Sequence, residues 1–283
     1  MAFLEIEHVG KTFFEANGQS LCVFKGVRLH VAKGEFVTMV GHSGCGKSTL
    51  LNIIAGLEKA TSGSIILDGK ELDQPGLDRM VVFQNFSLLP WLTVYENIRV
   101  AVKAAYPRWE RERIQDYTLK YINMVGLKGA EQKKPAALSG GMRQRVGIAR
   151  AFAVQPKVLL LDEPFAQIDA LTRGAIQEEL IHMWMSTKNT VFMVTHDVEE
   201  AIFLSDKIAL MTSGPDARLA EVVDIDFPRP RNREQLSDLP EYGGVKKRII
   251  QFLKDCAHKG SADGSAGELD SVILSTQTSA EVL

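Results

Sequence analysis

The chain has 283 residues and lacks the features that mark several classes of protein. No apolar run approaches the roughly 20 residues that a membrane-spanning helix needs, so we expect no transmembrane segment. The opening residues, Met-Ala-Phe-Leu-Glu, have no basic stretch before an apolar one and predict no secretory signal. The three cysteines, Cys22, Cys45 and Cys256, lack metal-ligand spacing, and their odd number disfavours a disulfide framework. These absences favour a soluble protein of the cytoplasm.

A strong charge of one sign is lacking as well. The formal net charge is −2, which gives no support for binding to nucleic acid. The basic run Lys246-Lys247-Arg248 stands among apolar residues at helical spacing, so we interpret it as the solvated face of a helix. With 45% hydrophobic residues, the chain has ample core for one large domain and a short appendage.

Apolar runs alternate with helical patterns along most of the chain. The predicted strands are residues 36–40, 64–67, 81–83, 158–161 and 191–195, and residues 47–57 form the first predicted helix. The pattern turns helical from Thr93 to about Val125, and a terminal helix is expected from about Tyr242 to Ala257. Strands that alternate with helices predict an α/β fold whose mostly parallel sheet is covered on both faces. Residues 259–283, rich in Ser, Ala, Gly and Thr, are predicted to be a disordered tail.

A complete phosphate-binding loop lies between the strand 36–40 and the helix that follows it. Its residues are Gly41, His42, Ser43, Gly44, Cys45, Gly46, Lys47, Ser48 and Thr49. The glycines are needed because backbone N–H groups must turn inward around an anion, where a side chain would obstruct them. Lys47 is predicted to reach the β- and γ-phosphates of ATP, and the Ser48 hydroxyl to coordinate Mg²⁺. Cys45 is expected to be a bystander that thiol reagents reach when ATP is absent.

Two carboxylates, Asp162 and Glu163, end the aliphatic strand 158–161. Ligands of open α/β sheets bind at the carboxyl edge of the strands, so this pair is placed for chemistry. Asp162 is predicted to hold Mg²⁺ through water, and Glu163 to polarise the attacking water in phosphoryl transfer. Because Pro164 follows, the pair could instead cap a helix.

The run Leu138-Ser139-Gly140-Gly141-Met142-Arg143-Gln144-Arg145 is the most specific motif of the chain. A serine hydroxyl and glycine N–H groups at a helix N-terminus suit a γ-phosphate, although Ser139 is also an ordinary N-cap, and both interpretations can hold together. The phosphate loop already serves the chain's own ATP. The economical explanation is that this run caps the ATP of another subunit, in a head-to-tail dimer.

These three motifs together resemble the ATP-hydrolysing subunit of ABC transporters, and the resemblance extends from about Leu4 to Ala257. It implies a P-loop NTPase (RecA-like) core with an antiparallel β subdomain and an inserted helical subdomain. Residues 1–92 and 146–227 would form the ATP-binding core, and residues 93–145 the helical signature subdomain. Residues 228–258 would be a short C-terminal extension.

The resemblance also assigns roles to single residues. Gln84 matches the glutamine that touches Mg²⁺ and water and hinges the helical subdomain. His196 matches the histidine that contacts the γ-phosphate and helps to fix the attacking water, although a histidine before Asp197 could simply cap a helix or pair locally. Phe13 matches the aromatic ring that stacks on adenine, with Phe14 or a plain core role as alternatives. The implied set is then Glu163, His196, Lys47 and Gln84 for catalysis, Ser48, Gln84 and Asp162 for the metal, and Asp169 beside the nucleotide.

The cargo is indicated by the segment 83–94, which looks like the importers of small oxyanions and sulfonates. The resemblance implies that two transmembrane permease subunits dock near Gln84–Thr93, and Pro90 and Trp91 fit a docking groove. The stretch Phe227-Pro228-Arg229-Pro230-Arg231 looks like the nitrate, sulfonate and taurine branch. Nitrate or nitrite import is favoured, with bicarbonate, sulfonate, taurine or cyanate import as alternatives. The chain would lie on the cytoplasmic face of the membrane and serve a periplasmic or lipid-anchored anion-binding protein.

One departure from the family pattern is Gln167, which is bulky and polar where a small residue is usual at the dimer interface. It favours a second ATPase subunit that is related but not identical, although a homodimer stays possible. A non-transport ABC ATPase is the alternative of another class. The DNA-repair type needs a very long coiled coil between loop and signature, and the translation type carries two ATPase halves. Neither fits this chain. An exporter subunit stays open, but the segment around Trp91 disfavours it.

Overall fold

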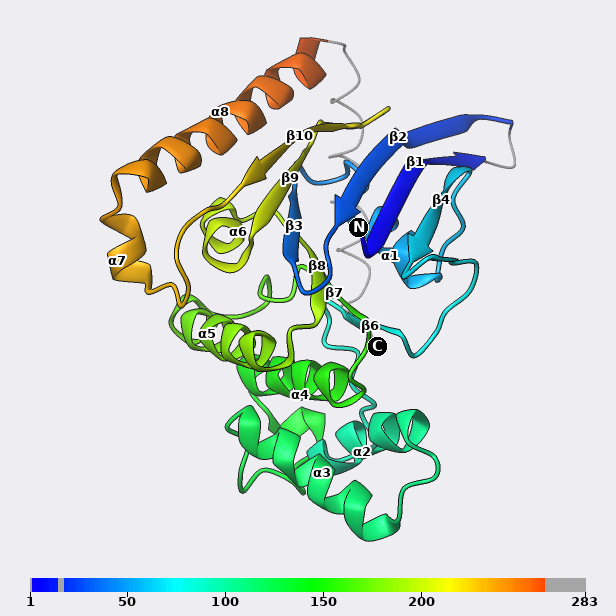
Figure 1. Cartoon of the computed structure of the whole chain (residues 1–283), viewed down its shortest axis with the longest axis vertical. Coiled ribbons are helices and arrows are strands. Elements are labelled where there is room, and N and C mark those ends of the chain that lie inside the picture. The colour runs from blue at the N-terminus through cyan, green and yellow to red at the C-terminus, as the bar shows by residue number, and fades with distance from the viewer. Residues whose placement is uncertain (1, 15–17, 263–283) are drawn as a thin grey trace, which may run out of the picture.

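The computed structural model of the chain describes residues 2–14 and 18–262. The strands are β1 (Leu4–Phe14), β2 (Ser20–Val31), β3 (Phe36–Val40), β4 (Ser62–Leu67), β5 (Lys70–Glu71), β6 (Arg79–Val82), β7 (Val158–Asp162), β8 (Thr190–Thr195), β9 (Lys207–Met211) and β10 (Leu219–Asp224). The helices are α1 (Lys47–Ala55), α2 (Val94–Ala105), α3 (Arg111–Met124), α4 (Gly140–Ala153), α5 (Ala170–Thr187), α6 (Val198–Leu204), α7 (Arg233–Ser237) and α8 (Pro240–Ala262), with a 3₁₀ turn at Pro135–Ala137. In Figure 1 the two sheets that the strands form lie in the upper part of the molecule with α8 beside them, and α2, α3 and α4 form the lower end.

The central sheet has six strands in the order β10-β9-β3-β8-β7-β6. The pairs β9–β3, β3–β8, β8–β7 and β7–β6 are parallel, and only β10 runs antiparallel at the edge. The second sheet, β2-β1-β4-β5, is antiparallel. Four of the predicted strands correspond to β3, β6, β7 and β8 of the central sheet, and the fifth corresponds to β4 of the second sheet, with ends that agree within two residues. Strands β9 and β10 were not predicted.

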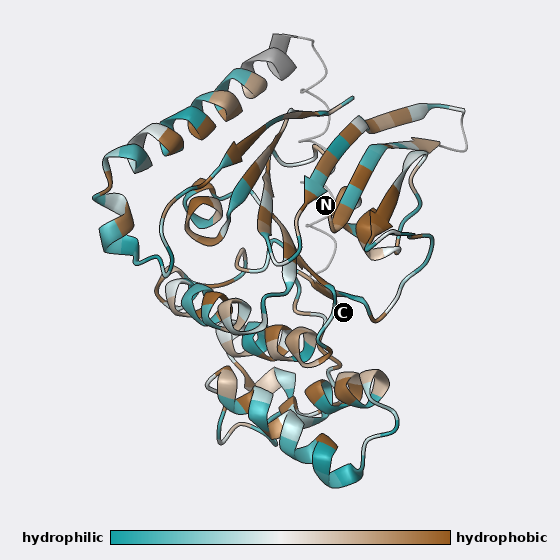
Figure 2. Ribbon diagram, viewed as in Figure 1, coloured by the Kyte–Doolittle hydropathy of each residue, from teal (hydrophilic) through white to brown (hydrophobic). Residues whose placement is uncertain are grey.

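Side chains of the parallel strands alternate between two hydrophobic cores. Phe36 and Val40 of β3 point to the core shared with the helices α2 to α6, whereas Val37 and Met39 point to the core under the antiparallel sheet and α1. Successive residues of a strand face opposite sides, so each central strand must be apolar on both faces. Figure 2 accordingly shows the central strands mostly in brown.

The predicted helical stretch 93–125 consists of two helices, α2 and α3. Pro107 lies in the break between them, because proline lacks an N–H and disfavours helical geometry in the residue before it. Tyr106 and Trp109 stack across the break with ring centroids 3.9 Å apart. The predicted boundary at 145/146 falls inside α4, which is one continuous helix from the signature run into the core.

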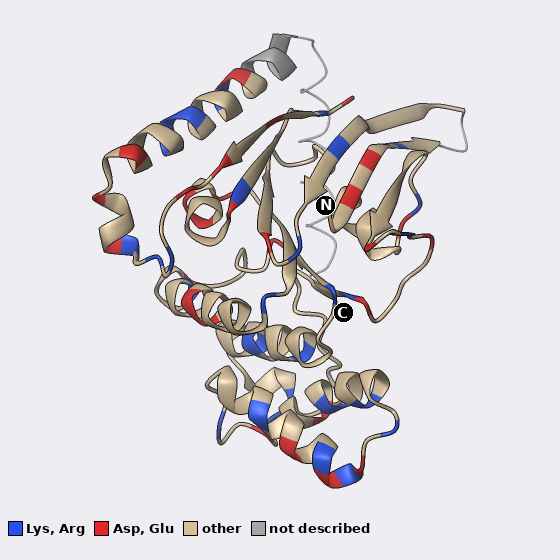
Figure 3. Cartoon of the chain, in the orientation of Figure 1, with Lys and Arg blue, Asp and Glu red and all other residues tan. Residues whose placement is uncertain are grey.

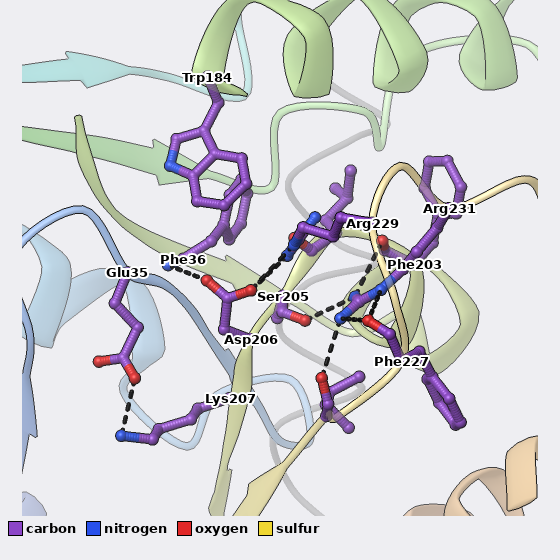
Figure 4. Close-up of polar contacts among 12 residues, drawn as sticks. Glu35, Phe36, Trp184, Phe203, Ser205, Asp206, Lys207, Phe227, Arg229 and Arg231 are labelled. Carbon is purple, nitrogen blue, oxygen red and sulfur yellow. Dashed lines mark hydrogen bonds and ion pairs between the residues drawn. The ribbon is translucent and has the colours of Figure 1, made fainter. Parts of the chain in front are cut away.

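The C-terminal segment returns to the central sheet before it ends in α8. Arg231 is nearly buried and donates to main-chain oxygens at the C-terminal end of α6, and Arg229 pairs with Asp206 at 2.7 Å (Figure 4). Helix α8 begins at Pro240 and continues to Ala262, five residues beyond the predicted end near Ala257. The first four residues of the predicted disordered tail are therefore helical, and residues 263–283 lie outside the described part of the chain.

The basic run of α8 is on a helix, as predicted, but it is not simply solvated. Lys246 forms an ion pair with Glu199 of α6, and Arg248 with Glu221 of β10. Within residues 2–14 and 18–262, no helix combines the length and the apolar character that crossing a membrane requires.

Candidate nucleotide-binding site

The predicted chemical residues meet at the carboxyl edge of the central sheet. Val40 pairs with Thr195 in the parallel register of β3 and β8, and Asp162 pairs with Val194 in that of β7 and β8. The three strand ends are therefore neighbours. The phosphate loop follows β3, Glu163 follows β7, and His196 follows β8, so residues far apart in the sequence share one site.

The phosphate loop requires glycine for two separate reasons at Gly46. Its φ is +96°, and a Cβ there would lie 2.6 Å from the side chains of Val23 and Phe24. Gly46 is also the N-cap of α1, and without a side chain it gives the helix no side-chain cap. The first N–H groups of α1 are therefore left to an outside acceptor, which is the arrangement that binds phosphate.

The Lys47 side chain folds back over the loop. Its ammonium donates to the main-chain oxygens of Gly41 at 2.9 Å and His42 at 2.8 Å, and it is almost completely buried. Both acceptors are carbonyls of the loop that the lysine serves. The cation is thus held over the loop, where it can neutralise a phosphate.

Ser48 and Asp162 form the link between the loop and β7. The Ser48 hydroxyl donates to Asp162 Oδ1 at 2.7 Å. Burial raises the pKa of the Asp162 carboxyl above its usual range, the neighbouring charge of Glu163 adds to this, and the bond from Ser48 and the charge of Lys47 oppose it. A hydroxyl and a carboxylate held together are hard oxygen ligands, and a divalent cation would stabilise the buried charge, so these residues fit Mg²⁺.

Glu163 and His196 face each other across the same edge. His196 Nδ1 lies 3.1 Å from Glu163 Oε2, and the imidazole is 62% exposed while the carboxylate is only 20% exposed. Glu163 adopts a left-handed backbone with φ +43° and donates its N–H to the Val194 oxygen at 3.0 Å. Such a conformation costs a non-glycine residue ~1 kcal/mol or more, and strain of this kind gathers at functional sites.

The alternative that these residues cap helices does not fit the structure. After Glu163 the chain forms turns, and the N-cap of the next helix is Asp169, so the acidic pair caps no helix among the described residues. The cap of α6 is Asp197, whose side chain accepts from the Glu200 N–H at 3.0 Å, and not His196. Asp162, Glu163 and His196 are thus free of a capping task.

Ser139 begins α4 and accepts from the Met142 N–H at 3.3 Å. It is therefore the N-cap that the sequence allows. Among the described residues, no hydrogen bond joins Ser139, Gly140 or Gly141 to the phosphate loop of the same chain. Helix α4 carries three arginines and no acid, visible as blue bands without red in Figure 3. A positive helix N-terminus with exposed Ser139 is suited to an anion from outside this chain.

The segment that follows β6 is held by two residues that the sequence analysis missed. Asn97 of α2 is fully buried, receives the Leu89 N–H at 2.9 Å and donates to the main-chain oxygens of Leu89, Leu92 and Thr93. Arg150 of α4 donates to the Ser87 oxygen at 2.8 Å. The signal in the sequence was a polar residue on an apolar helix face, which indicates a specific partner when that face is buried.

These contacts fix a loop whose backbone is itself unusual. Phe86 and Ser87 are both left-handed, with φ +63° and +42°. Gln84 is exposed just before them, and Trp91 is 64% exposed just after. Next to the loop, α2 and α3 line a hollow of about 790 Å³ whose walls include Arg99, Trp109 and Glu131.

Two further predicted site residues, Phe13 and Asp169, each have a local partner. Phe13 is 41% exposed near the end of β1, with the Lys11 ammonium 4.6 Å from its ring centroid, so it is not a core aromatic. Phe14 is 76% exposed, so it too stays available. Asp169 caps α5 by accepting from the Thr172 N–H at 3.0 Å, and that bond holds the pKa of its carboxyl below the usual range.

The prediction for Cys45 was wrong in one respect. The residue lies in the phosphate loop, but it is completely buried, and this burial raises the pKa of its thiol. A buried thiol with a raised pKa yields little thiolate, so we expect it to react slowly with thiol reagents. The loop wraps around this side chain, which the sequence pattern could not reveal.

Comparison with known proteins agrees with this geometry. The profile of the ABC transporter family matches residues 24–166. The nitrate import ATP-binding protein NrtD of Synechococcus elongatus is 47% identical over 251 residues, which cover 89% of this chain and 91% of that protein. The bicarbonate transport ATP-binding protein CmpD of the same organism is 47% identical over 251 residues, covering 89% and 90%. NrtC of Synechocystis, another nitrate import ATP-binding protein, is 48% identical over 256 residues, or 89% of this chain, which spans only 38% of NrtC's length.

Solved structures give the same result. The dimeric structure of MJ0796, a bacterial ABC transporter cassette, matches with a TM-score of 0.71 at 31% identity, covering 80% of this chain and 100% of that one. Its post-hydrolysis state bound to ADP and Pi matches with a TM-score of 0.70 and the same identity and coverage. The predicted resemblance and the predicted α/β fold class are thereby confirmed. The chain belongs to the ABC transporter family.

Proposed function

We propose that this chain is the ATP-hydrolysing subunit of an ABC importer that takes up a small anion. The observation that carries the proposal is the meeting of Lys47, the Ser48–Asp162 pair and the Glu163–His196 pair at one edge of the sheet. Nucleotide kinases share a phosphate loop, but a nucleotide kinase has no need of the signature helix. The chain is an ATPase of the ABC transporter type.

In this proposal each group at the edge has one task. The loop N–H groups and Lys47 bind the phosphates, and Phe13 stacks on adenine. Ser48, Asp162 and Gln84 would hold Mg²⁺, which supplies charge neutralisation when bound. Glu163 accepts a proton from the attacking water, and His196 orients Glu163 and the γ-phosphate. Phosphoryl transfer proceeds through a loose transition state, so positioning and charge account for most of the acceleration.

The unused signature helix supports a dimer. Ser139, Gly140 and Gly141 would bind the γ-phosphate of a partner's ATP, with Asp169 beside it. Leu171 at the start of α5 is 94% exposed and Gln167 is exposed near Gly140, so both suit a subunit contact. The bulk of Gln167 favours a related but different ATPase as partner, although a homodimer is the simpler case. ATP binding drives closure because only the closed dimer makes the second set of phosphate contacts.

The loop from Gln84 to Thr93 is the proposed docking site for two transmembrane permease subunits. Its support is the exposed Trp91 on a loop that Asn97 holds from inside. A fixed loop transmits force better than a mobile one. We also propose the division into an ATP-binding core (1–92 and 146–227), a helical part (93–145) and a C-terminal extension (228–258), and a location on the cytoplasmic face of the membrane.

The proposed cargo is nitrate or nitrite, delivered by a periplasmic or lipid-anchored binding protein. The relatives include nitrate and bicarbonate import proteins at the same 47% identity, so bicarbonate is the main alternative. Sulfonate, taurine and cyanate are others. The cargo does not touch this subunit, which is why the site alone favours none of them. Nothing in the proposal needs nucleic acid.

The test is labelled anion uptake in cells whose only copy of the gene carries Glu163→Gln, beside cells with the wild type. We expect nitrate uptake to be lost while bicarbonate and sulfonate uptake continue. Unchanged nitrate uptake, with loss of another anion's uptake, would contradict the nitrate assignment and leave the ATPase. Unchanged uptake of every anion would contradict the importer function.

A further inference from the structure

The phosphate loop is tied to the C-terminal helix by His42. This residue follows Gly41 in the loop, and its Nε2 lies 2.7 Å from the main-chain oxygen of Leu253 in α8. A carbonyl only accepts, so Nε2 must carry the proton and the ring donates. The two residues are 211 positions apart in the sequence. None of the roles assigned to the loop in ATP binding needs this contact.

The same residue also holds Lys47. The main-chain oxygen of His42 accepts from the Lys47 ammonium at 2.8 Å and from the Cys45 N–H at 3.4 Å. The side chain of His42 thus points to α8, and its carbonyl points to the catalytic lysine. A shift of α8 would move both groups, because they belong to one residue.

Helix α8 is anchored well enough to act as a support. Ile249 is completely buried in the core that β3 shares with the helices, and Phe252 and Leu253 pack against the same core. Lys246 pairs with Glu199, which stands on α6 only three residues after His196. Helix α8 therefore reaches both sides of the nucleotide site, the phosphate loop and the helix that begins after His196.

We propose that α8 positions the phosphate loop for ATP through the His42–Leu253 hydrogen bond, so that His42 is a positioning residue for nucleotide binding. The inference rests on the proposed ATPase function. A hydrogen bond in this setting contributes about 1.4 kcal/mol, which corresponds to a tenfold change in an equilibrium constant. We therefore expect His42→Ala to weaken ATP binding about tenfold.

The experiment measures the dissociation constant of ATP for the full chain and its variants. His42→Gln is the rescue, because a glutamine amide N–H can reach the place of Nε2, and it should bind ATP within about twofold of wild type. His182→Ala, an exposed histidine of α5, is the matched control and should change nothing. A wild type that binds no ATP would contradict the proposed function itself. If the wild type binds ATP and His42→Ala has the same dissociation constant, only the inference is overturned.

A second set of variants tests the role of α8. A chain that stops after Gln251 loses the Leu253 carbonyl but keeps Lys246, Arg248 and Ile249, whereas Leu253→Ala loses the side chain and keeps the carbonyl. We expect the shortened chain to weaken ATP binding about tenfold, Leu253→Ala to leave it unchanged, and His42→Ala to add nothing to the shortening. Additive effects would overturn the inference. If the shortened chain fails to fold, the His42→Ala and His42→Gln pair decides.

A readout independent of ATP is the alkylation of Cys45, followed separately from Cys22 and Cys256 by mass spectrometry. Cys45 is buried inside the loop, so it reacts only when the loop opens. We expect His42→Ala to speed this alkylation several-fold and His42→Gln to restore the slow rate. Equal rates in all three proteins would overturn the inference.

Discussion

The two ends of strand β3 are built in opposite ways. At its amino end, Phe36 donates its N–H to Asp206 at 2.9 Å, and Asp206 is held by Arg229, whose guanidinium lies 4.5 Å from the centre of the Trp184 ring (Figure 4). At its carboxyl end the strand opens into the phosphate loop and a helix N-terminus without a side-chain cap. Most polar groups at the first end bind one another, although Nη1 of Arg229 has no hydrogen-bond partner among the described residues, whereas those at the second are left for a ligand.

Arg231 is the fullest example of a polar group whose partners all lie within the fold. All three of its nitrogens donate, in six hydrogen bonds to five main-chain oxygens, those of Ile202, Phe203, Ser205, Ile225 and Phe227. Burial lowers the pKa of its guanidinium to about 10, which still leaves it charged at neutral pH. Glu163 is an example of a group left for a ligand. Its backbone is left-handed, and its partner is an exposed histidine. The comparison separates charges that support the fold from charges that are available for chemistry.

The largest loss of stability is expected at the amino end of β3, where polar groups bind one another. Arg231→Met leaves five main-chain oxygens without their donor, and we expect a loss of about 3 kcal/mol or more in the free energy of unfolding. Urea unfolding measures it, with Arg218→Met, at an exposed arginine, as the control within about 0.5 kcal/mol of wild type. A loss below about 1 kcal/mol for Arg231→Met would contradict the claim that the charges at the amino end of β3 support the fold.

A pH-dependent effect is expected at Glu200 of α6, which lies between the two ends. Burial raises the pKa of its carboxyl to about 8 from 4.5, Asp197 adds to the shift, and Thr195, Arg173 and Arg233 oppose it. The folded protein then keeps a proton that the unfolded chain has lost. Stability therefore falls as pH rises from about 4.5 to about 8, by at most about 1.4 kcal/mol per pH unit.

Glu200→Gln removes this titration and keeps an oxygen for the Gln177 amide, which donates to Glu200 at 3.1 Å. We expect the variant to gain on the wild type in unfolding free energy between pH 6 and pH 8. Parallel pH profiles of the two proteins would show that Glu200 is ionised in the fold, contrary to the account.

Ser139 has both kinds of role, because it supports the fold as a helix cap and is also a proposed contact for ATP. As the N-cap of α4 it contributes about 1 kcal/mol to stability, which Ser139→Ala should remove. Asn232→Ala removes a cap of α7 with a similar cost, far from any proposed nucleotide contact. We expect both variants to lose the same stability and only Ser139→Ala to lose ATP turnover in the assembled transporter. Equal turnover in the two would reduce Ser139 to a cap.

The central strands and the phosphate loop were easier to predict from the sequence than the residues that support them. Strands β3, β7 and β8 were predictable because they are apolar on both faces. The phosphate loop was predictable because its glycines have a conformational reason, and Lys47 and Ser48 a chemical one. The roles of Asn97, Arg150 and Arg231 were not predictable, because each binds main-chain oxygens, which leave no trace in the sequence of the partner segment. The burial of Cys45 depends on tertiary contacts in the same way.

The most direct test of the account is Glu163→Gln, measured for both unfolding and ATP turnover in the assembled transporter. The change is nearly isosteric and lies at the carboxyl edge of the central sheet, where groups are left for a ligand. We therefore expect an unfolding free energy within about 0.5 kcal/mol of wild type. Turnover should fall at least about a hundredfold, because general-base catalysis contributes on that order or more. Turnover within a few-fold of wild type would contradict the central claim, and so would a large loss of stability.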